Sequence, residues 1–102
     1  MLNLNGKWLL ELDTTIGRLE MILDLEVNGS ELTGTLNGKD NQDVPIVNGK
    51  VEGDTISFSA KLKSPMSGYI DTTTTLIANA DGIAGKIATP YGTFLAKLTK
   101  QD

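Results

Sequence analysis

The stretch RLEMILDLEV, residues 18–27, decides the fold, because its apolar side chains recur at every second position. From Leu19 to Val27 these side chains share one face of an extended strand, while charged side chains take most of the other face. A period of two residues is typical of a strand that is buried on one side only. The stretch TISFSAKLK, residues 55–63, repeats the pattern with a fully polar outer face. No stretch shows the helical period, so the sequence predicts an all-β protein.

Turn-forming residue pairs divide the rest of the chain into short strands. Asn-Gly and Asp-Gly pairs supply the positive φ angles that tight hairpins require. The turn signals are Asn28-Gly29, Asn37-Gly38, Asn48-Gly49, Gly53-Asp54 and Asp81-Gly82. They predict about eight strands, near residues 6–13, 18–27, 31–37, 44–51, 54–63, 69–78, 83–89 and 93–100.

The connections between these strands are too short for a helix or a crossover. Consecutive strands are therefore expected to pair as an antiparallel up-and-down meander. About eight twisted strands with one apolar face close most readily into a barrel. We predict a single β-barrel domain over residues 1–102. The alternative is a two-sheet β-sandwich, which would show the same alternation of apolar and polar residues.

The stretches NGSELTG, NGKVEG and DGIAG each place a turn glycine shortly before a second glycine in the following strand. The second glycines are Gly34, Gly53 and Gly85. A glycine within a strand lets the sheet bend sharply, as a small closed barrel requires. We expect this bending role at all three positions.

The composition excludes several classes of function. The chain has no cysteine and no histidine, so it lacks the residues of hydrolytic triads and of typical zinc sites. Its carboxylates fall at outward or turn positions, where solvent leaves nothing to separate their proton affinities. We therefore expect no catalytic residues, no metal site and no cofactor, and we predict a non-enzymatic protein.

The charge and hydropathy of the chain bear on whether it binds nucleic acid or membranes and on its cellular compartment. The net charge is -4 and Arg18 is the only arginine, so nucleic acid is not expected as a partner. No basic run would attract an anionic membrane, and no apolar stretch approaches the roughly 20 residues needed to cross one. No signal peptide is visible and cysteine is absent, which favours the cytoplasm without fixing the compartment.

The sequences GKW at Gly6–Trp8 and GSELTGT at Gly29–Thr35 resemble the opening of the avidin and streptavidin family and, more loosely, of lipocalin-like barrels. This resemblance implies a meander barrel. It also implies that Trp8 is a structural plug at one barrel end, in agreement with the inward parity of Trp8, Leu10 and Leu12. Avidin-like proteins surround biotin with tryptophans from later strands. This sequence has none after Trp8, so biotin binding is not expected.

The segment YIDTTTTLIA, residues 69–78, is the most unusual in the chain, because strand alternation turns Thr72 and Thr74 inward. Two hydroxyls in an apolar lumen would orient a small apolar ligand. The candidate lumen residues are Phe58, Thr72, Thr74, Leu76 and Phe94. The alternative is that threonine simply favours strands and that each inward hydroxyl bonds to the backbone.

Three apolar side chains, Leu9, Ile22 and Leu95, have outward parity on strands that barrel closure would bring together. They predict an apolar stripe on the outer wall, which would serve as a homo-oligomer interface. The alternative is that isolated exposed aliphatic residues are common. The sequence thus favours a module that binds a small apolar ligand, with a structural or interaction protein that homo-oligomerises as the second possibility.

Overall fold

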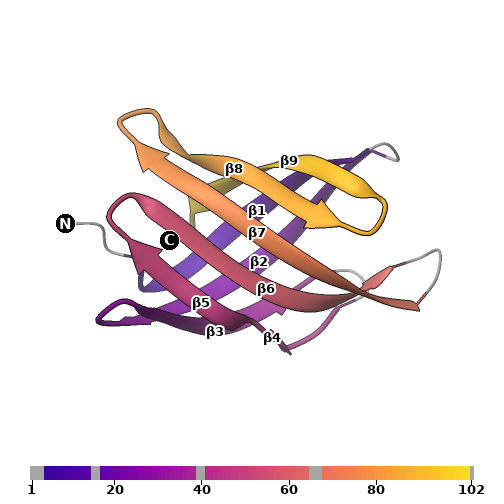
Figure 1. Ribbon diagram of the computed structural model, residues 1–102, viewed down its shortest axis with the longest axis horizontal. Coiled ribbons are helices and arrows are strands. Elements are labelled where there is room, and N and C mark those ends of the chain that lie inside the picture. Colours follow the sequence, from indigo (N-terminus) through magenta and orange to yellow (C-terminus); the bar gives the residue numbers. More distant parts are fainter. Residues whose placement is uncertain (1–3, 15–16, 39–40, 65–67, 102) are drawn as a thin grey trace.

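The computed structural model describes residues 4–14, 17–38, 41–64 and 68–101. Those residues form antiparallel strands that wrap into a barrel (Figure 1). The strands are β1 Gly6–Thr14, β2 Gly17–Asn28, β3 Glu31–Asn37, β4 Val44–Pro45, β5 Val47–Glu52, β6 Thr55–Ser64, β7 Gly68–Asn79, β8 Gly82–Thr89 and β9 Gly92–Lys100.

The barrel closes because β1 pairs with β2 on one side and with β9 on the other. Every other pairing joins strands that follow one another along the chain, apart from the contact of β3 with β5 across the very short β4. The result is a closed eight-stranded antiparallel barrel with one extra strand. The predicted all-β meander barrel is confirmed, and the sandwich alternative is wrong because the sheet closes on itself.

The predicted strand 44–51 is divided at Ile46 into β4 and β5. The register of β5 against β6 shifts between Val47 and Lys50. Asn48 lies within this shift and has a φ of 54°, so it is the bulge residue of the strand. The prediction that Asn48-Gly49 marks a hairpin turn is therefore wrong.

The β2–β3 and β5–β6 hairpins each have a tight loop that begins with a glycine, Gly29 or Gly53. Their φ angles are 65° and 60°, in the left-handed region where a side chain is disfavoured. In NGKVEG the expected roles are thus reversed. Gly53 makes the turn, and Gly49 is the glycine within the strand.

Three glycines allow a close approach of neighbouring strands. They are Gly34, Gly49 and Gly85, where an added Cβ would press on the carbonyl oxygen of Asp24, Leu32 and Thr75, respectively. The neighbour is backbone in each case, so it has little freedom to move aside. At Gly34 and Gly85 the geometry shows a close backbone approach, and the bending role expected of them stays a prediction.

The interior of the barrel is filled by one cluster of buried apolar side chains, as the alternating sequence predicts. Leu19 is an exception, since it has inward parity but is 42% exposed. It lies near the beginning of β2, at the rim of the barrel. At the opposite end, on the left of Figure 1, lie the start of β1, the end of β9 and the β2–β3, β5–β6 and β7–β8 hairpins.

Candidate functional site

The structure places the predicted lumen residues inside the barrel, on strands β6, β7 and β9. Phe58, Thr72, Thr74 and Leu76 are buried, and Phe94 is partly buried against the same cluster. Thr74 pairs across the sheet with Phe58 on one side and with Ile87 on the other, and Ile87 pairs with Phe94. Phe58, Leu76 and Ile87 are part of the packed cluster, and Phe94 packs against it.

The two inward threonines carry the polar groups that were expected to orient a ligand in the lumen. The Thr72 hydroxyl donates a hydrogen bond of 2.7 Å to the carbonyl oxygen of Ala60 on the neighbouring strand. Among the described residues, every fully enclosed side-chain nitrogen or oxygen has a hydrogen-bond partner. The Thr72 hydroxyl is therefore engaged by the fold, as the alternative interpretation of this segment expected.

Trp8 lies in the core at the barrel end where β1 begins, and only 7% of it is exposed. Its indole N–H donates a hydrogen bond of 2.9 Å to the carbonyl oxygen of Leu4. The Lys100 ammonium lies 5.1 Å from the centre of the indole ring and also donates to the carbonyl oxygen of Asn5. Trp8 is thus anchored by burial, a hydrogen bond and a cation–π contact.

A hollow of about 430 Å³ opens in the barrel wall where β4 lies beside β6 without pairing with it. Its lining includes the aliphatic residues Val44, Pro45 and Val47 together with Lys61 and Thr72. This volume lies within the range of small-molecule sites, which are mostly apolar with a few placed polar groups. Of the predicted lumen residues, Thr72 is the one that reaches this hollow.

The hollow exists because the ladder between β5 and β6 ends at the Val47/Ser59 pair. Further along β6, the Lys63 N–H donates to the side-chain oxygen of Asn41 at 2.7 Å, so the edge is closed again there. Lys61 and Pro45 both line the hollow between these two points, and proline has no N–H to donate to a ladder.

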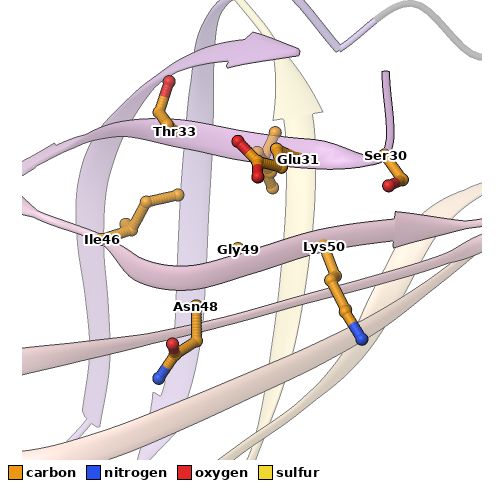
Figure 2. Close-up of a pocket in the computed structure, with 8 residues that line it drawn as sticks. Ser30, Glu31, Thr33, Ile46, Asn48, Gly49 and Lys50 are labelled. Atoms are coloured by element: carbon orange, nitrogen blue, oxygen red, sulfur yellow. The ribbon is translucent and has the colours of Figure 1, made fainter. Parts of the chain in front are cut away.

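A second hollow, of about 630 Å³, lies between β3 and β5 at the Asn48 bulge. Figure 2 shows that the side chains of Asn48 and Lys50 point to one side of β5, away from Thr33 on β3. The polar groups of Asn48 and Lys50 therefore do not converge with the hydroxyl of Thr33. We regard the smaller and more aliphatic hollow between β4 and β6 as the candidate site.

The predicted outer stripe is only partly assembled. Leu9 and Ile22 are directly opposite each other on β1 and β2, and both are partly buried. Leu95 is 62% exposed but lies opposite Asp13 and Lys86. Leu9 and Leu95 are not opposite each other, because the residue opposite Leu9 is Thr99. The pair of Glu11 and Lys97 lies between the two leucines along these strands.

No known protein family, no curated protein and no solved structure matches this chain. The structure therefore supports the closed eight-stranded antiparallel barrel, and no family is identified for this chain. Within the described ranges, no group of three acidic, histidine or cysteine side chains is placed to hold a metal ion. The same residues contain no helix that is long and apolar enough to cross a membrane.

The sequence did contain a signal for this site. Proline within a strand removes a ladder hydrogen bond and often marks an edge or a bulge. Pro45 lies in such a strand, close to the Asn48-Gly49 pair. Together they indicated a break in the predicted strand 44–51, although not the hollow that lies beside this break.

Proposed function

We propose that this protein is a non-enzymatic module that binds a small apolar molecule in the hollow between β4 and β6. The observation that carries the proposal is a space of about 430 Å³ in the barrel wall, lined by Val44, Pro45 and Val47. The lumen is occupied by the packed cluster. The ligand therefore lies in the wall, and of the predicted lumen residues Thr72 borders its site.

Each part of the barrel has a role in this proposal. The aliphatic side chains of β4 and β5 contact the apolar body of the ligand and shield it from water. Lys61 and Asp71, which are opposite each other on β6 and β7, lie at the border of the hollow. Trp8 is the structural plug of the distant end and does not contact the ligand.

The test uses the neutral fluorescent dye N-phenyl-1-naphthylamine and a charge placed in the hollow. Val47→Glu should weaken dye binding by about tenfold or more, because the new carboxylate resists burial against an apolar ligand. Val47 is 50% exposed, and Ile77, at 55%, is a matched outer residue of β7 that does not line the hollow. Ile77→Glu should leave the affinity unchanged. Equal effects of the two variants, or no dye binding, would remove the proposal.

The second candidate function is homo-oligomerisation through the outer wall. It is favoured by Leu95, a large apolar side chain that is 62% exposed, and by the adjacent pair Leu9 and Ile22 on the neighbouring strands. In an oligomer, Leu95→Lys should dissociate the assembly and leave the far-ultraviolet circular dichroism of the monomer intact. Native mass spectrometry measures this directly, and an unchanged mass would exclude an interface at Leu95.

A further inference from the structure

We propose that copies of this chain associate head to tail, with an acidic side of one barrel lying against a basic side of the next. The inference rests on the second candidate function, homo-oligomerisation, and names the two surfaces that meet. It does not depend on ligand binding in the hollow between β4 and β6.

The first step is the separation of charge around the barrel. The described strands β1 to β3 carry six carboxylates against the two cations Lys7 and Arg18, which gives a net charge of -4. These carboxylates, the acidic wall, belong to Glu11, Asp13, Glu20, Asp24, Glu26 and Glu31. The described strands β6 to β9 carry five lysines against the single carboxylate of Asp71, which gives a net charge of +4. These lysines, the basic wall, are Lys61, Lys63, Lys86, Lys97 and Lys100.

The second step is the strand order, which places the two walls on opposite sides of the barrel. Around the closed sheet, β2 is followed by β3, β5, β6 and β7, so β7 lies across the ring of eight strands from β2. In Figure 1, β6 and β7 pass in front of β1 and β2. A two-fold contact centred on either wall would bring like charges together, because both copies then use the same surface. Opposite charges meet when the acidic wall of one copy contacts the basic wall of another.

The third step is that the fold itself pairs few of these charges. Arg18 lies 3.3 Å from Glu11, and the other ion pair of the described residues joins Lys50 and Glu52 on β5, outside both walls. In the described chain no lysine of the basic wall forms an ion pair. Glu20 lies directly opposite Glu11 on the neighbouring strand, and like charges at opposite positions destabilise a sheet. A second copy that places lysines over this wall would relieve the repulsion.

The fourth step is that each wall also has an apolar side chain among its charges. Ile22, which is partly buried, lies between Glu20 and Asp24 on the outer face of β2. Leu95 is 62% exposed on β9 and lies opposite Lys86 on β8. Contact of these apolar groups removes them from water, while the surrounding charges select the partner surface and its orientation.

The experiment is sedimentation velocity of the full chain at rising protein concentration, in low salt and in about 1 M sodium chloride. In low salt the assemblies should grow beyond a dimer, because each copy that joins still presents one free wall. In about 1 M salt the association should weaken by about tenfold or more, because the Debye length falls to about 3 Å. A dimer that does not grow, or an association that is indifferent to salt, would overturn the inference.

Charge reversals make the test specific for the two walls. Lys86→Glu and Glu20→Lys each reverse one charge of one wall and should weaken the association by about fivefold or more in low salt. Lys50→Glu and Glu52→Lys change the net charge by the same amounts on β5 and should alter it by less than about twofold. Glu20→Lys also removes the like-charge pair with Glu11, so its Tm should not fall, which separates lost association from lost folding.

A mixture of the two wall variants tests the head-to-tail geometry. The Lys86→Glu variant keeps its acidic wall, and the Glu20→Lys variant keeps its basic wall. An equimolar mixture should therefore associate with about the affinity of the original protein, although each variant alone does not. A mixture that associates no better than its components, or control variants that weaken the association as much as the wall variants, would refute the contact between the walls.

The outcomes also separate this inference from the function on which it rests. If Leu95→Lys dissociates an oligomer that none of the charge reversals affects, homo-oligomerisation stands and the contact between opposite walls is overturned. If the original protein stays monomeric at every concentration in low salt, homo-oligomerisation itself is absent, and both proposals fail.

Discussion

Leu76 and Ile77 are neighbours on β7 and give a sharp test of the barrel. Leu76 is 0% exposed, whereas Ile77 is 55% exposed. Leu76→Ala removes a large side chain from the packed interior and leaves a cavity, at a cost of about 3–4 kcal/mol in the free energy of unfolding. Ile77→Ala removes a side chain from the solvated wall and should change that free energy by less than about 0.5 kcal/mol.

The expected difference is large in relation to the stability of such a chain. Domains of this size have free energies of unfolding of about 5–15 kcal/mol. The Leu76→Ala variant should therefore remain folded at low temperature, but with a much smaller free energy of unfolding than the original protein. With about 2.1 cal/mol/K of unfolding entropy per residue over the 102 residues, 3–4 kcal/mol corresponds to a fall in Tm of about 14–19 °C. Urea titration followed by circular dichroism measures the free energies of unfolding independently.

The pair also tests the register, because a slip of β7 by one residue would exchange its two faces. Ile77 would then be buried and Leu76 exposed. A larger loss of stability for Ile77→Ala than for Leu76→Ala, or equal losses, would refute the assignment of inner and outer faces.

Two further substitutions test particular contacts in the wall. Thr72→Val keeps the shape of the side chain but removes the hydrogen bond to the Ala60 carbonyl, so urea titration should show a loss of about 1 kcal/mol in the free energy of unfolding. Gly85→Ala places a Cβ against the Thr75 carbonyl oxygen and should lower the free energy of unfolding by about 1–3 kcal/mol, because backbone must shift. An unchanged Tm for Gly85→Ala would contradict the close approach of β7 and β8.

Much of the fold was predictable because alternation is a local property of the chain. The pattern around Leu23, Phe58 and Leu76 identified inward residues before any pairing was known, and all three are buried. The same parity placed Leu19 inward, yet it is 42% exposed. Parity assigns a residue to a face of the sheet, but it does not say how far along the barrel axis that residue lies.

The outer stripe shows a second limit of sequence reasoning. Outward parity was enough to select Leu9 and Leu95, and the strands that carry them are indeed neighbours. Their relative register is set by the closing pair of strands, which lie at opposite ends of the chain. That register places Asp13 beside Leu95, and no local turn in the sequence fixes it, unlike the register of a hairpin.

The sequence by itself determined the class of the protein, its meander order and most of its interior, since these depend on periodicity and on turn chemistry. Only the tertiary structure decided the candidate site. The Asn48-Gly49 pair suits a turn or a bulge equally well, and the pairing of β5 with its neighbours selects the bulge. Likewise, the hollow lined by Val44, Pro45 and Val47 exists because the barrel brings β4 beside β6 without pairing the two strands, and strand alternation alone does not show this.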